Sequence, residues 1–161
     1  MTEKQAVPKI SAYCSKAERC EYDVRKKLLA WKLEDAAINR IIAILRAERF
    51  LDDKRYVLSF VRDKMRFNKW GQQKIRFELK KKRIPDNLIQ AAFDELSDDD
   101  CFEESLMGLL QTKLKTVKAT NDCERKMKLF RFAAGRGFRP DLIRQCLNKL
   151  ITVTIDDEYP V

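Results

Sequence analysis

Histidine is missing from the 161 residues of this sequence. Without an imidazole, the chain lacks the residue needed for a Ser-His-Asp or Cys-His catalytic pair, and it cannot form a mixed Cys/His zinc site. No other set of converging polar groups with the spacing of an active site is apparent in the sequence. We therefore expect a protein that has no catalytic activity and needs no cofactor.

Glycine and proline are scarce, at four residues each. Tight turns, hairpins and phosphate-binding loops depend on these residues, so an all-β fold and a Rossmann fold are both disfavoured. The nucleotide-binding patterns GxxxxGK[ST] and GxGxxG are absent. The close pair Gly135 and Gly137 fits the C-terminal end of a helix better than a nucleotide site. With 45% apolar and 37% charged residues, the composition is typical of a mostly helical protein.

Long apolar runs are also missing. No stretch approaches 18 apolar residues, and the first ten residues, MTEKQAVPKI, lack the pattern of a signal peptide. We expect a cytoplasmic protein that makes no contact with a membrane. The cysteines are odd in number and form no CxxC pair, so we interpret them as reduced side chains rather than as a metal or redox site. They are Cys14, Cys20, Cys101, Cys123 and Cys146.

What the sequence does contain is an internal repeat of about fifty residues. A shift of 51 residues superposes the segment 22–45 on the segment 73–96, which places Leu28 on Leu79. A further shift of 54 residues places Leu79 on Ala133 with the same apolar frame. The sequence thus predicts three repeats and a C-terminal tail, at residues 8–50, 51–97, 98–150 and 151–161.

The apolar residues within each repeat have helical spacing. Val57, Phe60 and Val61, for example, lie on one face of a helix, and Asp52 and Asn121 are suited to cap helix N-termini. A fifty-residue unit buries too little core to be stable alone. We therefore predict an all-α fold of three tandem three-helix repeats stacked into an elongated, curved array. The predicted helices cover residues 8–18, 21–31, 35–48, 53–67, 71–82, 86–96, 98–117, 122–135 and 140–150.

Positive charge is concentrated in residues 62–83, which we call the basic tract: ten of its twenty-two residues are basic and two are acidic. So large a local surplus repels itself, and we expect contact with a polyanion rather than a merely solvated face. Trp70, beside the predicted turn at Gly71, is suited to stacking on a base or, equally, to wedging between helices. The candidate contact residues are Arg62, Lys64, Arg66, Lys69, Trp70, Lys74, Arg76, Lys80, Lys81 and Arg83.

An acidic segment follows, and no basic residue occurs between Arg83 and Lys113. The question of a metal site is raised by its closely spaced carboxylates, which are Asp98, Asp99, Asp100, Glu103 and Glu104. Consecutive residues at a helix start point in different directions, however, and acidic side chains there complement the helix dipole. We therefore interpret the segment as an acidic surface for a basic neighbour or partner, and we expect no metal.

A family resemblance lies in the residues just before and within the basic tract. The RecX regulators of bacterial RecA recombinase have a central signature similar to ERFLDDKRYVLSFVRDKMRFNKWGQQKIRFELKKKRI, and a first repeat similar to EYDVRKKLLAWKLEDAAINRIIAILRAERFLDD. The resemblance covers residues 10–96 well and the third repeat by its pattern only. One departure is Lys69-Trp70-Gly71-Gln72, where many relatives have Gly-Tyr-Gly-Pro. The matching positions are Phe50, Leu51, Asp52, Asp53, Arg55, Tyr56, Phe60, Val61, Arg62, Gly71, Ile75, Arg76 and Leu79.

This resemblance implies a non-enzymatic regulator that binds the RecA–DNA filament and inhibits its growth and ATP hydrolysis, with roles in recombination, DNA repair and the SOS response. It also implies weak contact with single- or double-stranded DNA without sequence specificity. We expect a monomer that bridges recombinase subunits, with the third repeat as a second attachment. The second attachment would comprise Lys113, Lys115, Lys118, Arg125, Lys128, Arg136 and Arg144.

A transcription regulator of the helix-turn-helix type is the alternative that the helical pattern leaves open. Such a protein should prefer one duplex sequence over others by several orders of magnitude, whereas a filament ligand should depend on the recombinase.

Overall fold

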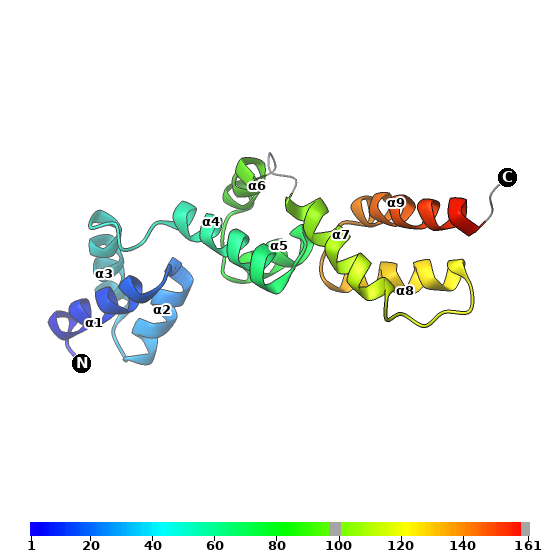
Figure 1. Ribbon diagram of the computed structural model, residues 1–161. Coiled ribbons are helices and arrows are strands. Elements are labelled where there is room, and N and C mark those ends of the chain that lie inside the picture. The colour runs from blue at the N-terminus through cyan, green and yellow to red at the C-terminus, as the bar shows by residue number, and fades with distance from the viewer. Residues whose placement is uncertain (97–100, 159–161) are drawn as a thin grey trace. The chain divides into compact units, whose positions relative to one another are not determined.

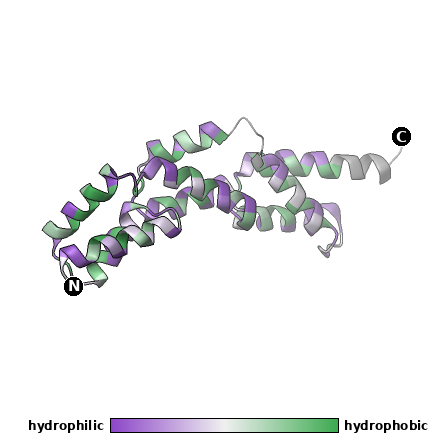
Figure 2. Cartoon of the chain, turned by 60° about the vertical axis from the view of Figure 1, so that its left-hand side comes forward, coloured by the Kyte–Doolittle hydropathy of each residue, from purple (hydrophilic) through white to green (hydrophobic). Residues whose placement is uncertain are grey.

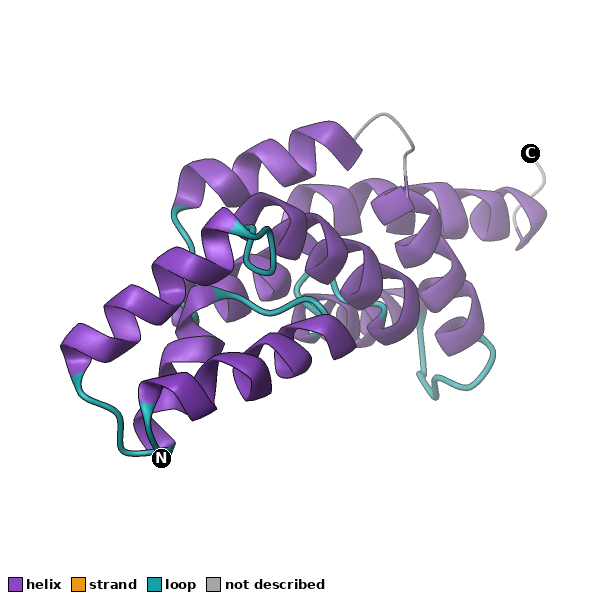
Figure 3. Ribbon diagram, turned by 90° about the vertical axis from the view of Figure 1, so that its left-hand side faces the viewer, coloured by secondary structure: helices purple, strands orange, loops and turns teal. Residues whose placement is uncertain are grey.

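The computed structural model describes residues 1–96 and 101–158 of the chain (Figure 1). In these two stretches every regular element is a helix, and no strand is present (Figure 3). The predicted all-α class is therefore confirmed. The elements are α1 (Glu3–Lys16), α2 (Glu21–Ala30), α3 (Asp35–Ala47), α4 (Asp53–Asp63), the π-helix η1 (Lys64–Asn68), α5 (Gln72–Lys81), α6 (Asp86–Leu96), α7 (Cys101–Leu114), α8 (Asp122–Gly135) and α9 (Pro140–Glu158).

The helices form two compact units. Unit one comprises Met1–Phe60 together with Leu79–Ala92. Unit two comprises Val61–Glu78 together with the described residues from Phe93 onward. Helices α4, α5 and α6 each contribute residues to both units. The basic tract is consequently divided, with most of its cations in unit two.

The core of unit one is built from the apolar stripes that the repeat analysis identified. Ile10 on α1, Leu28 on α2, and Ile38 and Leu45 on α3 are buried and belong to one cluster. Each is three or four residues from another apolar position on its own helix, so each helix offers a single apolar face. Figure 2 shows apolar residues interleaved with polar ones along the helices.

Unit two is held together mainly by α7, α8 and α9. Helix α8 packs against α9, and α7 packs against both of them and against η1. Leu106 and Leu110 on α7, Leu129 on α8 and Ile143 on α9 are fully buried. These side chains lie at helical spacing in the sequence, as predicted for the third repeat.

The second helix of each repeat ends in the same way, which supports the repeat assignment at the level of the backbone. The second residue after each helix adopts a left-handed conformation, with φ between 59° and 89°, and the next N–H closes a wide turn onto a carbonyl five residues earlier. The left-handed residues are Lys32, Arg83 and Gly137, and the closing bonds join Leu33 to Leu28, Ile84 to Leu79 and Phe138 to Ala133. Gly135 and Gly137 therefore mark a helix end, as predicted.

Four helices differ from the prediction by three residues or more, and one of them, α7, ends at Leu114 instead of residue 117. Helix α1 begins five residues before the predicted start, because Thr2 and Gln5 cap each other reciprocally and Pro8 is accommodated inside the helix. The helix predicted for 53–67 is α-helical only to Asp63 and continues as η1. Helix α9 continues to Glu158 instead of ending at residue 150, since Ile151 extends its buried stripe. The repeat boundaries and the elongated form of the array stay predictions.

Candidate anion-binding interface

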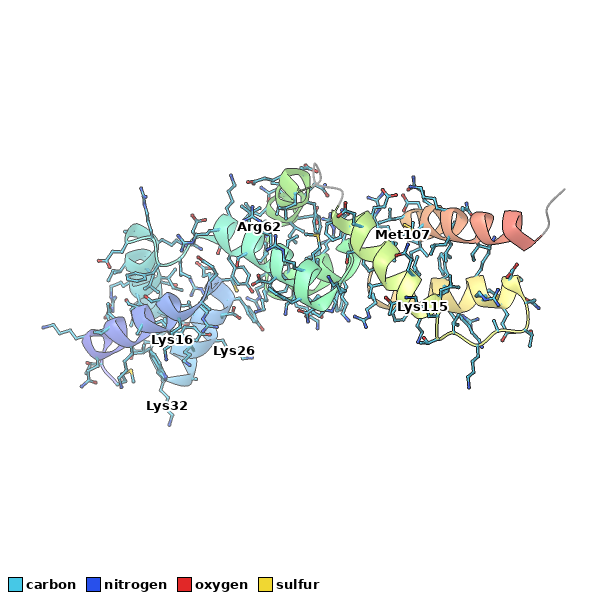
Figure 4. All side chains as sticks on the ribbon, in the orientation of Figure 1. Lys16, Lys26, Lys32, Arg62, Met107 and Lys115 are labelled. Carbon is cyan, nitrogen blue, oxygen red and sulfur yellow. The ribbon has the colours of Figure 1, made fainter. Side chains whose placement is uncertain are left out.

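The candidate contact residues fall in two places. Arg62 on α4, Lys64 and Arg66 on η1, Lys69 and Trp70 in the following turn, and Lys74 and Arg76 on α5 belong to unit two. Lys80 and Lys81 at the end of α5 and Arg83 after it belong to unit one. Figure 4 labels Arg62, whose side chain is exposed.

Three exposed cations of unit two are available for an external anion. Arg62, Arg66 and Lys69 have no ion pair or hydrogen bond from their side chains within residues 1–96 and 101–158. They follow one another at spacings of three and four residues, across the junction of α4, η1 and the next turn. Unpaired cations at this spacing can neutralise successive phosphates without first breaking an internal contact.

Trp70 lies in the middle of this region. Its ring is partly buried, with the Lys64 Nζ at 5.0 Å and the Lys74 Nζ at 4.7 Å from the ring centroid. Both ammonium groups are close enough for a cation–π interaction. Trp70 thus fixes two neighbouring cations, and whether it also stacks on a base stays a prediction.

Other cations of the basic tract have internal partners. The Arg76 Cζ lies 5.2 Å from the centroid of the buried Phe93 ring. The Lys80 Nζ lies 3.4 Å from Asp86 Oδ1, with both side chains more than half exposed. An exposed pair of this kind is screened by water and is worth at most about 1 kcal/mol, so Lys80 can still exchange Asp86 for an external anion.

Lys82 is the one tract lysine that we did not assign to the interface, and its surroundings are structural. Its Nζ donates to Asp23 Oδ1 at 3.1 Å and Oδ2 at 3.2 Å, and the Cys20 Sγ donates to Asp23 Oδ2 at 3.2 Å. Burial raises the pKa of Cys20 to about 11 and that of Tyr56 to about 12. Desolvation alone would lower the pKa of Lys82, but hydrogen bonds to Tyr56 and Asp23 outweigh it and raise that pKa.

The turn after η1 is tied to the turn between α8 and α9. The Gly71 N–H donates to the Arg136 carbonyl at 2.8 Å, and the Gln73 N–H donates to the Gly137 carbonyl at 2.9 Å. The Arg136 guanidinium in turn donates to the Asn68 carbonyl at 3.1 Å. Lys69 adopts a left-handed φ of 55° in this turn. The central tract and the third repeat therefore share one rigid element within unit two.

The predicted second attachment is partly neutralised. Arg125 forms an ion pair with Asp122. The Lys128 Nζ lies 3.1 Å from Glu124 Oε1 and donates to the Lys118 carbonyl. Hydrogen bonds from Thr120, followed by the one from Lys128, lower the pKa of Glu124 to about 2. Arg125 and Lys128 are accordingly weaker candidates for an external contact.

The other five side chains of this set lie on the surface or beside aromatic rings. Lys115, labelled in Figure 4, and Lys118 are exposed. The Arg144 Cζ lies 5.9 Å from the Phe130 ring centroid. Lys113 Nζ and Arg136 Cζ lie 5.2 Å and 5.4 Å from the centroid of Phe132.

One depression of about 400 Å³ in unit two is lined by Lys69 from the first set of candidate residues and by Lys113 and Arg136 from the second set. We call it the cationic hollow. Phe132 and Leu109 contribute apolar lining, and Glu104 is the one carboxylate among the described residues around it. Sequence reasoning placed Lys69 in a different attachment from the other two, because these residues are 44 or more positions apart in the chain.

Two exposed aromatic residues of the basic tract were missed by the sequence reasoning. Phe67 on η1 is 76% exposed and Phe77 on α5 is 60% exposed. Both directly follow an arginine, Arg66 or Arg76, and this alternation of aromatic and basic residues was the available signal.

Metal binding and membrane insertion find no support in the part of the chain that the structure describes. No group of three or more metal-ligating side chains gathers there. Glu103 of the acidic segment forms an ion pair with Lys149 at 2.6 Å, while Asp98, Asp99 and Asp100 lie outside the described residues. None of the described helices combines the length and the apolar character needed to span a membrane.

Two family models match the chain. The model of the RecX second three-helix domain matches residues 52–92, and that of the RecX third three-helix domain matches residues 102–147. Two solved structures share the fold. The crystal structure of RecX from Lactobacillus salivarius has a TM-score of 0.84 at 24% identity and covers 93% of this chain and 97% of that one. A crystal structure of regulatory protein RecX has a TM-score of 0.80 at 22% identity, with 89% and 72% covered.

Curated relatives agree with the family models. Regulatory protein RecX of Clostridium botulinum (strain Eklund 17B / Type B) is 31% identical over 141 residues, which is 86% of this chain. This chain spans 65% of that relative's length. Regulatory protein RecX of Prosthecochloris aestuarii is 29% identical over 149 residues, which cover 92% of this chain and 95% of the relative. The tandem three-helix domains, the family models and these relatives agree, and the chain belongs to the RecX family of regulatory proteins.

Proposed function

We propose that this protein regulates a RecA-type recombinase by binding the RecA–DNA filament and inhibiting its growth and ATP hydrolysis. The observation that carries the proposal is the match of two RecX domains to residues 52–92 and 102–147, which contain the basic tract and the cationic hollow. The resemblance of the tract to regulators of RecA supports the choice of partner. The protein would act by occupancy, without a catalytic residue of its own.

The available charge supports a contact with the DNA of the filament. Arg62, Arg66 and Lys69 are exposed, and none has a side-chain ion pair within the described stretches. If three phosphates of a duplex are neutralised, the logarithm of the binding constant should fall by about 2.7 units for each tenfold rise in salt concentration. Such a contact has no sequence specificity, because phosphates carry no sequence information.

Bridging of recombinase subunits is the proposed mechanism. A ligand that holds two neighbouring subunits hinders both the addition of subunits and their conformational cycling during ATP hydrolysis. Bridging requires at least two separated contacts, and effective concentration makes the second contact strong once the first has formed. The basic tract and the predicted second attachment, which has exposed cations at Lys115 and Lys118, would supply the two contacts.

The test is the rate of single-strand-dependent ATP hydrolysis by the host's RecA at increasing concentrations of this protein. We expect inhibition by the parent chain. The double variant Arg62→Glu/Arg66→Glu should require at least about tenfold more protein for half-inhibition, because it removes two phosphate contacts and adds repulsion. Lys16→Glu/Lys26→Glu is the matched control: it changes the net charge equally at two exposed positions of unit one (Figure 4).

Two results distinguish the proposed function from the alternative, a transcription regulator. Unchanged ATP hydrolysis at saturating protein would contradict the proposal. Binding of the protein alone to two unrelated duplexes, measured by fluorescence anisotropy, should give equal affinities. A preference for one duplex by several orders of magnitude would instead indicate a transcription regulator.

A further inference from the structure

The cationic hollow has a composition that DNA contact does not explain. Its three cations come from three different segments: Lys69 from the turn after η1, Lys113 from α7 and Arg136 from the turn after α8. Arg136 is fixed by its bond to the Asn68 carbonyl. The lining between these cations is mainly apolar. A site of this kind suits a ligand that has both an apolar part and negative charge.

A stripe of small residues on helix α7 and in the turn after it forms part of the lining. Ser105, Gly108, Thr112 and Thr116 follow one another at steps of three or four residues and all line the hollow. A Cβ atom on Gly108 would meet no heavy atom within 4 Å, so close packing does not require glycine there. Glycine inside a helix is destabilising relative to alanine. The side chain that Gly108 lacks would occupy the hollow.

The hydroxyl groups of this stripe present acceptors. Thr112 Oγ1 donates to the Gly108 carbonyl at 3.0 Å, and Thr116 Oγ1 donates to the Lys113 carbonyl at 3.2 Å. Their hydrogens are therefore engaged, and their oxygen lone pairs are left for an N–H group. The Ser105 Oγ is buried in the stripe and has no hydrogen-bond partner among the described residues.

We propose that the cationic hollow binds an acidic peptide segment of the protein partner, with one apolar side chain inserted against Phe132 and Leu109. Flanking carboxylates pair with Lys113 and Arg136, which leaves Lys69 for the phosphate contact proposed above. This inference rests on the proposed function, because it assigns the hollow to the protein component of the filament rather than to its DNA.

Two features favour a peptide over a nucleic acid. The ring of Phe132 already lies near Lys113 and Arg136, so a stacking base must displace cations that a carboxylate can engage as they stand. The hydroxyl acceptors of α7 match peptide N–H groups, whereas a phosphodiester backbone has no donor. Glu104 at the hollow repels a continuous polyanion, while a short peptide can place its apolar residue there.

The test measures binding of a fluorescein-labelled, capped peptide of sequence DEFLDE to the full chain by fluorescence anisotropy, with no recombinase present. We expect saturable binding that is lost with the peptide DEGGDE, which has no apolar residue. Gly108→Leu should weaken binding at least about tenfold by filling the hollow, and leucine is a better helix former than glycine. Lys113→Glu should weaken it about tenfold by removing a charge-assisted contact.

Gly135→Leu is the matched control. Gly135 also has no heavy atom within 4 Å of a Cβ, but it does not line the hollow, so this variant should bind like the parent. Equal binding by all variants, or equal loss in Gly135→Leu, overturns the inference. The inference is also overturned if oligo(dT) displaces the peptide and if Gly108→Leu and Lys113→Glu abolish the binding of oligo(dT). The hollow would then be a nucleic-acid site.

Measurement of ATPase inhibition separates this inference from the proposed function. If the peptide binds as expected but the parent chain leaves recombinase ATP hydrolysis unchanged, the proposed function fails and the hollow still binds acidic peptides. If the parent chain inhibits ATP hydrolysis but the peptide does not bind, the inference about the hollow is wrong and the proposed function stands. Loss of both peptide binding and inhibition in Gly108→Leu supports both.

Discussion

Replacing Gly71 by alanine tests whether the turn after η1 is held by the turn after α8. A Cβ on Gly71 would lie 2.5 Å from the Gly137 carbonyl carbon and closer still to the backbone of Phe138. All of these atoms are backbone atoms, so no side chain can rotate away to make room. The two turns must separate, although each is anchored by its own helix.

The expected loss of stability follows from the bonds between the turns. Separation breaks the hydrogen bonds from Gly71 to Arg136 and from Gln73 to Gly137, each with a net worth of about 1 kcal/mol. Gly71 is buried, and leaving its N–H unpaired adds about 1 kcal/mol or more. We expect a loss of about 3 kcal/mol, which corresponds to a fall in Tm of about 6–12 °C for a chain of this size.

The assay is urea unfolding of unit two followed by the fluorescence of Trp70, in a Trp31→Phe background that removes the only other tryptophan. The control is Gly108→Ala, which meets no atom within 4 Å and should stabilise α7 by up to about 1 kcal/mol. If Gly71→Ala unfolds within about 0.5 kcal/mol of its parent, the two turns are not coupled and the shared element of unit two is wrong.

Four further predictions concern both units. Lys82→Met should destabilise unit one by about 1–3 kcal/mol, as followed by Trp31 fluorescence, because the partly buried carboxylate of Asp23 loses its cation, whereas Lys26→Met at an exposed position should not. The free energy of unfolding should fall as pH rises from 9 to 12, because folded Cys20 and Tyr56 keep their protons up to about 11 and 12 while the unfolded chain releases them near 9.0 and 10.0; a flat profile would contradict this. Of the four described cysteines, exposed Cys123 should react first with a thiol reagent at pH 8. If the three buried thiols reacted as fast as Cys123, their burial would be refuted. Small-angle scattering should give a radius of gyration above the value of about 15 Å expected for a compact chain, as the predicted elongated array requires.

The fold class was predictable because it depends on local patterns. Apolar residues at helical spacing mark the buried faces, and the 51- and 54-residue shifts recover equivalent positions in the three repeats. Two predicted N-caps are present: Asp52 Oδ1 accepts from the Arg55 N–H and Asn121 Oδ1 accepts from the Glu124 N–H. Each of these features involves residues within one or two helical turns of one another.

The π-helix was not predictable from spacing. Residues 53–67 continue the apolar pattern of a helix, and nothing local indicates that the hydrogen bonds widen after Asp63. The wider turn ends at left-handed Lys69, whose neighbour Trp70 donates to the Lys64 carbonyl at 3.1 Å. The turn that follows it is held by a hydrogen bond from Gly71 to the Arg136 carbonyl, 65 residues away in the sequence.

The cationic hollow was beyond sequence reasoning for the same reason. Its lysines and its arginine are distributed over residues 69–136, and only the packing of η1 against α7 and of α7 against α8 brings them together. Charge counting grouped Lys69 with its sequence neighbours and Arg136 with others. The structure brings them together where the turn after η1 is hydrogen-bonded to the turn after α8.

The run Lys80-Lys81-Lys82 shows how far charge in a sequence differs from charge that a partner can use. Three identical residues in succession have the same sequence signal, but a helix turns by about 100° at each step. Lys80 lies beside exposed Asp86, Lys81 is on the surface, and Lys82 turns inward to Asp23. Charge reversal at Lys82 would therefore weaken the proposed filament binding only by disturbing unit one, whereas reversal at Arg62 or Arg66 removes positive charge without breaking a described ion pair. The tract's ten basic residues set an upper limit on phosphate contacts, and the number without an internal partner determines the salt dependence that a binding experiment should find.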